Sequence, residues 1–283
     1  MSGILYLVGT PIGNLGDFSP RAVQTLEEVD FIAAEDTRVT LKLLNHFGVR
    51  KPMLSYFEHN RRERGEQIAA RLLAGESCAL VTDAGMPAVS DPGEDLVALC
   101  HERGIPVRAV PGPAAFVTAL ALSGLPVGRF TFEGFLSVNK RSRREHLASL
   151  AEERRTMVFY EAPHKLPATL RDLYQALGDR RIAIVRELTK VHEEVIRTTL
   201  EQAALEFADG GLRGEIVLVI EGAEKPVQDT VTLDEAVETA RRRMEGGQSA
   251  SDAARQTARE TGLKKGDIYK ALLEAPEDTD TNR

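Results

Sequence analysis

The chain has 283 residues and a mass of 31.0 kDa, a length that suggests two domains with a small appendage. Hydrophobic residues make up 42% and charged residues 28%, which excludes a disordered, collagen-like or disulfide-stapled chain. The 36 basic and 43 acidic residues give a net charge of −7. Because proteins that coat nucleic acid without sequence preference are normally basic, a nucleic-acid role would require a local basic patch and a specific fit.

The two cysteines and the apolar segments predict a cytoplasmic protein with no metal site and no membrane partner. Cys78 and Cys100 lie in the apolar contexts CALV and VALC without CxxC spacing, so we expect two buried reduced thiols. The start, MSGILYLVGTPIGN, lacks a basic region and is typical of a strand rather than a signal peptide. The longest apolar stretch, 114–125, is too short to span a bilayer.

The first half of the chain alternates strand-like and helix-like segments. We expect strands at 4–8, 31–34, 79–82 and 106–110, and helices at 19–28, 41–47, 61–73, 94–103 and 113–122. Strands that are apolar throughout, each followed by a helix, predict a parallel sheet covered on both faces. We place the end of this α/β domain at residue 125.

The second half predicts another α/β domain, 126–222, with a more mixed sheet. Its expected strands are 130–134, 156–160, 181–186, 194–199 and 215–221, and its expected helices are 144–150, 166–177 and 200–208. Residues 223–283 would form a linker (223–230), helices at 233–245, 251–261 and 267–273, and a disordered tail from 276. Thr232–Glu235 and Ser249–Asp252 match capping boxes, and the last two helices have a helix-turn-helix layout.

Small and acidic residues gather after two of the predicted strands. The glycine-rich segment 9–16 is neither GxGxxG nor a P-loop, which counts against a dehydrogenase or an NTPase; its glycines could be structural or could admit a ligand. Segment 81–93, VTDAGMPAVSDPG, follows a strand at the edge where open α/β sheets bind ligands. Asp83 there would suit a hydroxyl or ammonium partner, whereas Asp91 could do the same or simply cap the next helix.

Three further polar clusters have a structural and a functional interpretation each. Segment 35–38, Glu-Asp-Thr-Arg, could cap a helix or face the same cleft. Segments 159–165 and 186–194 could supply a base and phosphate contacts, or be solvated loops. The basic run 140–144, KRSRR, could be a solvated helix face or a phosphate-binding patch. The absence of Trp and an aromatic content of 5% argue against base stacking as the main binding mode.

Eight segments taken in order resemble the tetrapyrrole methylase superfamily and, within it, the ribosomal RNA small subunit methyltransferase I family: GTPIGN, AAEDTR, VTDAGMPAVSDPG, VPGPAA, FEGFL, FYEAPHKL, RELTKVHEE and GEIVLVIEG. The resemblance covers about residues 5–222, and the C-terminal helical extension is similar too. It implies two α/β domains with S-adenosylmethionine (SAM) in a cleft between them, a homodimer, and 2′-O-methylation of a cytidine in the decoding centre of 16S ribosomal RNA.

The resemblance also implies which residues contact SAM. By their place in the motifs these are Ile12, Asp83, Gly85, Met86, Ala114, Ala115 and Tyr160. Two positions depart from the family pattern: Met86 stands where Thr is common, and Ser137 stands where Pro is common. We expect Met86 to alter the packing against the cofactor and Ser137 to loosen the loop that carries the basic patch.

Methyl transfer to a ribose hydroxyl requires alignment of donor and acceptor and a base for the hydroxyl proton. Our candidate bases, in order, are Glu35 or Asp36, then Glu161 with His164, then Glu187. The candidate phosphate contacts are Arg38, Lys140, Arg141, Arg143, Arg144 and Lys190. An acidic protein that must find one nucleotide would read shape, so the expected partner is an assembled or nearly assembled small ribosomal subunit.

Two other functions stay open at this stage. A small-molecule methylase could act on a tetrapyrrole, although such a substrate would need neither the basic run nor the C-terminal helices. A non-enzymatic nucleic-acid-binding module could be built on the helix-turn-helix, which carries Arg255, Arg259, Lys264, Lys265 and Lys270 but also several acidic residues.

Overall fold

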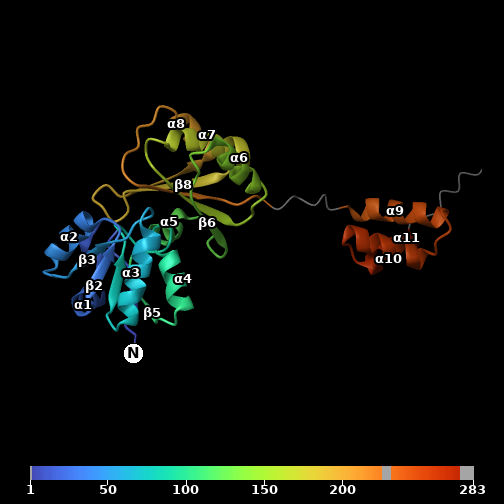
Figure 1. Ribbon diagram of the computed structural model, residues 1–283. Helices are drawn as coiled ribbons and strands as arrows, with labels where there is room; N and C mark the ends of the chain where they lie inside the picture. The colour runs from blue at the N-terminus through green and yellow to red at the C-terminus, as the bar shows by residue number, and fades with distance from the viewer. Residues whose placement is uncertain (1, 225–230, 275–283) are drawn as a thin grey trace, which may run out of the picture. The chain divides into compact units, whose positions relative to one another are not determined.

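The computed structural model describes residues 2–224 and 231–274, and its contacts divide the chain after Ala223 into two compact units. The first unit holds two β-sheets with their helices, and the second holds three helices (Figure 1). Most of the expected linker at 223–230, and the expected disordered tail from 276, lie outside the described residues.

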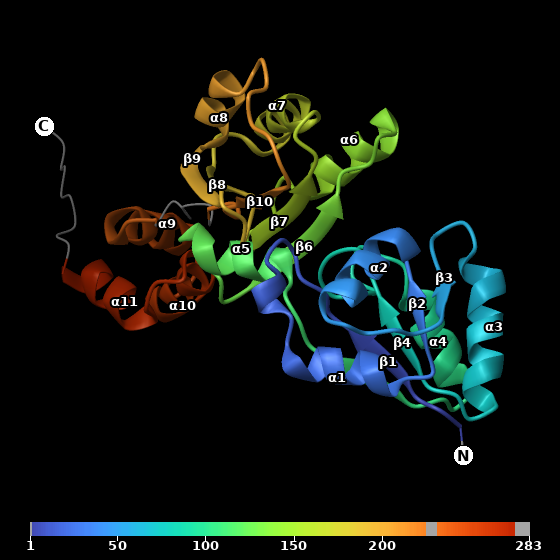
Figure 2. The ribbon, with the colours of Figure 1, turned by 90° about the vertical axis from the view of Figure 1, so that its left-hand side faces the viewer.

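The first sheet has five parallel strands in the order β3-β2-β4-β1-β5. They are β1 (Leu5–Val8), β2 (Phe31–Ala34), β3 (Met53–Ser55), β4 (Cys78–Val81) and β5 (Val107–Val110). Helices α1 (Pro20–Glu28) and α2 (Thr37–His46) pack on one face, and α3 (Arg61–Leu73) and α4 (Glu94–Glu102) on the other (Figure 2). A short 3-10 helix, η1 (Leu15–Asp17), precedes α1.

The prediction of a parallel sheet covered on both faces is confirmed. All residues of β2 and β4 are buried, because successive side chains point alternately into the two helix layers. Strand β3 was missed. Its three residues are half-buried at the edge of the sheet, and so short a segment carries no clear alternation.

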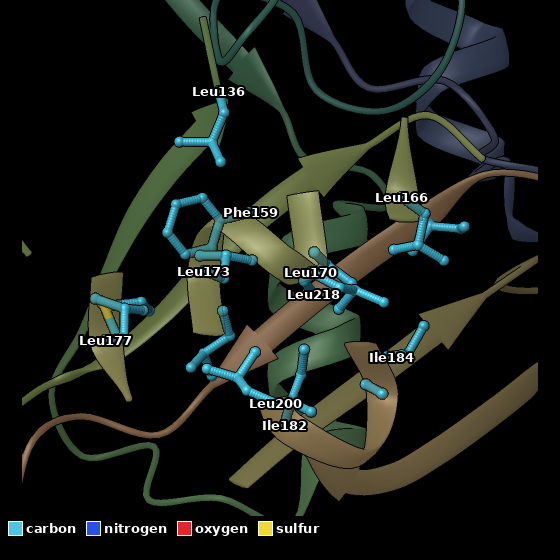
Figure 3. Packing of buried hydrophobic residues seen from close by; sticks show 14 of the residues in the cluster. Leu136, Phe159, Leu166, Leu170, Leu173, Leu177, Ile182, Ile184, Leu200 and Leu218 are labelled. Carbon is cyan, nitrogen blue, oxygen red and sulfur yellow. The ribbon is translucent and has the colours of Figure 1, made fainter. Parts of the chain in front are cut away.

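The second sheet is mixed, as expected, with the strand order β6-β7-β10-β8-β9. It contains β6 (Phe130–Phe135), β7 (Thr156–Glu161), β8 (Arg181–Arg186), β9 (Glu194–Thr199) and β10 (Ile216–Ile220); β6 runs parallel to β7 and the other pairs are antiparallel. Helices α6 (Lys140–Ser149), α7 (Leu166–Leu177) and α8 (Leu200–Glu206) cover one face, and α5 (Ala115–Ser123) covers the other. Figure 3 shows the first of these cores, where Phe159 and Leu218 of the sheet meet Leu170 and Leu173 of α7.

The helix that carries the basic run begins earlier than the sequence suggested. The predicted start at residue 144, with the run in a preceding loop, is wrong, because α6 already begins at Lys140. Its first turn has no apolar residue and therefore no hydrophobic periodicity. The missed signal is Asn139, an N-cap whose side chain accepts hydrogen bonds from the backbone N–H groups of Arg141 and Ser142 at 3.0 and 3.2 Å. Ser137 Oγ in turn accepts from Asn139 N–H at 3.1 Å.

The C-terminal unit consists of α9 (Leu233–Glu245), α10 (Ala250–Thr261) and α11 (Lys265–Glu274), packed around small residues and Ile268. Thr232 and Glu235 form the expected capping box. The second expected box is wrong. Ser249 accepts from Asp252 N–H, but the Asp252 carboxylate bonds the Ser249 hydroxyl at 2.6 Å rather than its N–H, because Asp is shorter than the Glu or Gln of a full box.

Two searches over the described ranges, 2–224 and 231–274, found neither a membrane-spanning candidate nor a metal cluster. No helix there is long and apolar enough to cross a bilayer. No three His, Cys, Asp or Glu side chains in those ranges are grouped so that they could hold a metal ion.

Candidate functional site

A cavity of about 400 Å³ lies in the first unit and is lined by residues of both sheets. Its volume falls within the range of roughly 300–1,000 Å³ typical of small-molecule sites. The first sheet contributes the loops that follow β2 and β4, and the second contributes the end of β7 and the start of β10. The seven residues expected to contact the cofactor all line it: Ile12, Asp83, Gly85, Met86, Ala114, Ala115 and Tyr160.

Glycines bring three loops of the first sheet into contact next to the cavity, which Gly85 and Met86 line. A Cβ on Gly9 would lie 2.7 Å from both the Gly112 Cα and the Met86 Sδ, so these loops touch through bare backbone. Thr10 and Gly85 exchange backbone hydrogen bonds of 2.9 and 3.2 Å. The glycine-rich segment after β1 therefore serves loop packing, and this packing in turn shapes the cavity.

Carboxylates gather at the carboxyl ends of β2 and β4. Glu35 Oε2 accepts hydrogen bonds from Thr82 Oγ1 at 2.5 Å and from Asp83 N–H at 3.4 Å, while Asp83 Oδ1 accepts from Asp36 N–H at 3.2 Å. Burial, and then the negative charge of Glu35, raise the pKa of Asp83. The same two causes raise the pKa of Asp91 to about 6.

Asp91 was not among the predicted site residues, yet it lines the cavity with Glu35 and Asp83. Its alternative interpretation as a helix cap is wrong, because Gly93 is the N-cap of α4 and makes no side-chain capping bond. The signal was present in the sequence as a second carboxylate in the loop after β4. What the sequence could not reveal is that this loop folds back toward the cavity.

Asp36 and Arg38 are occupied with each other beside the site. Asp36 is the N-cap of α2 and accepts from Arg38 N–H at 2.8 Å, and its Oδ2 lies 2.6 Å from Arg38 Nη2. These hydrogen bonds lower the pKa of Asp36 to about 2. Asp36 is therefore a poor proton acceptor at neutral pH, and the capping interpretation holds for it. The Arg38 side chain, although paired with Asp36, is 87% exposed and so remains accessible to solvent or a phosphate.

The second sheet supplies an aromatic wall. The Tyr160 hydroxyl accepts a hydrogen bond of 3.2 Å from Phe116 N–H at the start of α5. The rings of Phe132 and Phe135 lie 5.1 and 5.5 Å from the Tyr160 ring, centroid to centroid. A β-bulge between Phe132 and Gly134 interrupts β6 just before Phe135, which lines the cavity yet is 60% exposed. The low overall aromatic content gave no hint of this cluster.

Glu161 and His164 do not meet. Glu161 lines the cavity but is 5% exposed, and it accepts hydrogen bonds from Thr169 Oγ1 and from Ala162 N–H. His164 is exposed and lies outside the cavity lining. Arg143 donates to Thr169 Oγ1 at 2.9 Å, so this arginine of the basic run is tied to the Glu161 side of the site.

Glu187 and Lys190 lie in a tight turn after β8 and form a cluster with Glu215, which is the one of the three that lines the cavity. Lys190 Nζ lies 3.0 Å from Glu187 Oε1 and 3.2 Å from Glu215 Oε2. The hydrogen bond from Lys190 lowers the pKa of Glu187. Glu187 and Thr189 both have left-handed backbone angles, φ +52° and +65°. Glu187 is thus held as an ion-paired carboxylate away from the cavity lining.

The basic run 140–144 contains exposed side chains and one side chain, that of Arg143, that is bound to a neighbouring helix. Lys140, Arg141 and Arg144 are exposed on the first turns of α6, and Arg141 pairs with Glu145 at 2.8 Å. The Arg143 side chain is 16% exposed and pairs with Asp172 of α7 at 2.6 Å. Three of the four expected phosphate contacts in this run are therefore exposed to a partner, whereas the fourth, Arg143, joins α6 to α7.

A family model of tetrapyrrole (corrin/porphyrin) methylases matches residues 4–204. A protein of Synechocystis named ribosomal RNA small subunit methyltransferase I is 50% identical over 277 residues, covering 98% of this chain and 99% of the relative. A protein of the same name from Halalkalibacterium halodurans is 45% identical, covering 94% and 93%. Among solved structures, uroporphyrin-III C-methyltransferase from Thermus thermophilus, complexed with S-adenosylhomocysteine, is similar to this chain with a TM-score of 0.54 and 17% sequence identity. The match covers 77% of this chain and 96% of that chain and shows a similarity of fold. The chain therefore belongs to the tetrapyrrole methylase family and, within it, to the ribosomal RNA small subunit methyltransferase I family.

Proposed function

We propose that this protein transfers a methyl group from SAM to the ribose 2′-oxygen of a cytidine in the decoding centre of 16S ribosomal RNA. The observation that carries the proposal is the identity of up to 50%, over nearly the whole chain, with proteins named for methylation of small-subunit ribosomal RNA. The cytidine and its 2′-oxygen rest on the motif resemblance. The proposal includes a cytoplasmic homodimer, which sedimentation of the purified protein would test.

The cavity fits SAM in chemistry as well as in size. Ala114 and Ala115 leave room for a flat ring, and Ile12 and Met86 offer apolar surface. The Asp83 carboxylate complements the positive sulfonium and ammonium groups of the donor. We propose that the seven cavity-lining residues of the resemblance hold the cofactor, with Tyr160 closing the second-sheet side.

The chemistry requires little from the protein beyond alignment and proton removal. Bound SAM supplies a methyl group on a sulfonium, which is already a good leaving group. The cavity residues fix its position relative to the acceptor and exclude water. A carboxylate at the ends of β2 and β4 would accept the proton of the ribose hydroxyl, which is a weak nucleophile at neutral pH. The 2′-hydroxyl marks the acceptor as RNA.

The exposed cations of α6 suit the phosphates around the target nucleotide. Lys140, Arg141 and Arg144 project from one helix end, and Arg38 is exposed after β2. Phosphate contacts of this kind position a nucleic acid without reading its sequence. Because the net charge is −7, we propose that the shape of an assembled or nearly assembled subunit supplies the specificity.

A test of the proposed function uses isotope-labelled SAM and small ribosomal subunits from cells that lack this gene. Nuclease digestion and mass spectrometry should place the label on one ribose 2′-oxygen of a decoding-centre cytidine. Strong transfer to a short naked RNA would contradict the need for a particle. Methylation of a uroporphyrinogen, with no label on subunits, would replace the proposal by the small-molecule function. Loss of subunit binding after deletion of 231–283, with SAM affinity kept, would assign RNA docking to the C-terminal helices.

A further inference from the structure

The loop between β4 and α4 holds Asp91 in a strained backbone. Ala88 and Ser90 have φ angles of +67° and +65°, which residues with side chains rarely adopt. Such strain persists where the surrounding structure enforces it, and it clusters at active sites. The loop packs closely at Gly93, where a Cβ would lie 2.8 Å from the Leu80 side chain and 3.0 Å from the Ala88 Cβ, and Ser90 Oγ lies beside Gly134 of β6.

Asp91 has no role in helix capping or ion pairing among the described residues that would explain its position. It does not cap α4, and none of the ion pairs formed by the described residues includes it. Its side chain lines the cavity, where Glu35 faces it from the end of β2 and Asp83 from the end of β4. Tyr160 faces it from β7, and its hydroxyl is already bonded to the start of α5. The Thr82 hydroxyl, whose proton goes to Glu35 at 2.5 Å, lies on this side as well and lowers the pKa of Asp91.

The other carboxylates near the site are each engaged: Asp83 accepts a hydrogen bond from Asp36 N–H, and Glu215 pairs with Lys190. Asp36 is bound by Arg38, and Glu187 is bound by Lys190. Glu161 accepts hydrogen bonds from Thr169 and from the backbone. Glu35 accepts from the Thr82 hydroxyl and from the Asp83 backbone. Burial and the negative charge of Glu35 raise the pKa of Asp91 to about 6, which suits a base that must be ionised at pH 7 and still bind a proton readily.

We propose that Asp91 is the catalytic base of the methyl transfer. Its carboxylate takes the proton of the ribose 2′-hydroxyl while the new oxygen–methyl bond forms and the sulfur–methyl bond of the donor breaks. The products are the ribose methyl ether, S-adenosylhomocysteine and a protonated Asp91, which returns its proton to water after product release. This assignment rests on the proposed function and identifies the residue that accepts the proton in that reaction.

The main test compares Asp91→Asn with a matched control, Asp95→Asn. Asp95 lies four residues further on, in α4, and pairs with Arg61 at the surface at 3.0 Å, outside the cavity lining. Removing a general base is expected to slow single-turnover transfer to subunits by about 10²–10⁴-fold. Calorimetry should give the wild-type affinity for SAM in both variants, and Asp95→Asn should transfer methyl groups at the wild-type rate.

The pH profile provides a second test that does not depend on how the variant folds. The wild-type kcat/KM should fall with unit slope below about pH 6, because the base is then protonated. Glu35→Gln should move this limb to lower pH, because it removes the negative charge that raises the pKa of Asp91. In the protein without SAM, infrared difference spectra should show a carboxylic acid band that titrates near pH 6 and is missing in Asp91→Asn.

Several outcomes would overturn the assignment. Wild-type transfer by Asp91→Asn, or a wild-type profile that is flat from about pH 5 to 8, would exclude Asp91 as the base. Loss of SAM binding in Asp91→Asn would make it a cofactor contact instead. Abolition of transfer by Glu35→Gln, with Asp91→Asn active, would move the role to Glu35. A wild-type protein that binds SAM but labels no ribosomal RNA would refute the proposed function itself, a result distinct from all of these.

Discussion

The Thr82 hydroxyl donates a hydrogen bond of 2.5 Å to the Glu35 carboxylate and thereby joins the loops that follow β4 and β2. Thr82 is 3% exposed, so the bond is formed out of water. Because the Thr82 hydroxyl also lowers the pKa of Asp91, one side chain affects both the geometry and the charge of the carboxylate group.

Thr82→Val should therefore change stability and pH dependence together. Loss of a buried hydrogen bond to a charged group costs about 1.5–3 kcal/mol of unfolding free energy. The acid limb of the methyl-transfer profile should move to higher pH, because Asp91 loses the neighbouring hydroxyl that lowers its pKa. Urea unfolding and the pH profile measure the two effects. Thr82→Ser keeps the hydroxyl and is the control; an identical shift in Thr82→Ser would show that the methyl group, not the bond, is responsible.

Gly9→Ala should damage the cofactor site without adding any charge. The new Cβ would lie 2.7 Å from the Gly112 backbone and from Met86 Sδ, so the loops after β1, β4 and β5 must separate. Overpacking of this kind typically costs about 1–3 kcal/mol. We expect a lower melting temperature and at least roughly a tenfold loss of SAM affinity, the equivalent of about 1.4 kcal/mol. Gly128→Ala, with nothing within 4 Å of the new methyl group, is the matched control and should behave as wild type.

The fold could be predicted from the sequence wherever a buried element has a recognisable local pattern of apolar residues. Strands β2 and β4 are continuous apolar runs, and this pattern alone indicates a sheet covered on both faces. The prediction failed where the signature is weak. The start of α6 depends on the Asn139 cap and not on apolar spacing, and β3 owes its place to pairing with β2 at the edge of the sheet.

The site could be predicted only as far as its residues belong to motifs. All seven expected cofactor contacts line the cavity. Six of them follow strands of the first sheet whose ends meet at one edge, and the seventh, Tyr160, lies near the end of β7 in the second sheet. The sequence alone could not show which carboxylate remains available to act as a base. That depends on partners distant in the chain, such as Thr169 for Glu161, and on the loop that carries Asp91 into the cavity.

Asp91→Asn should stabilise the protein at neutral pH. The pKa of Asp91 is about 6 in the folded protein against 3.8 for the unperturbed group, so the folded state favours the neutral acid. The contribution to stability is fully present below about pH 4 and is lost as the pH rises through about 6. Asparagine stays neutral, so the variant should exceed the wild type by about 1–3 kcal/mol at pH 7, with allowance for solvent screening in an open cavity.

Urea unfolding of both proteins at pH 4 and pH 7 measures this difference. The gain should be largest at pH 7 and should vanish at pH 4, where Asp91 is protonated in the wild type as well. A catalytic group held in a state that destabilises the fold is a common compromise between stability and activity. An equal effect at both pH values would contradict the pKa assignment and attribute the change to packing.

Substitutions in the basic run of α6 should distinguish the residues that contact RNA from Arg143, which joins α6 to α7. Replacing Lys140 and Arg144 by Ala removes two exposed cations, and we expect weaker binding to small subunits with a salt dependence reduced by roughly two phosphate contacts. The melting temperature of this double variant should equal that of the wild type. Arg143→Ala should instead lower the melting temperature, because Arg143 bonds Asp172 and Thr169 of α7 and is 16% exposed. Filter binding across a salt series and thermal unfolding measure the two properties. If the double variant binds subunits with the wild-type salt slope, the exposed end of α6 is a solvated surface and the RNA docks elsewhere.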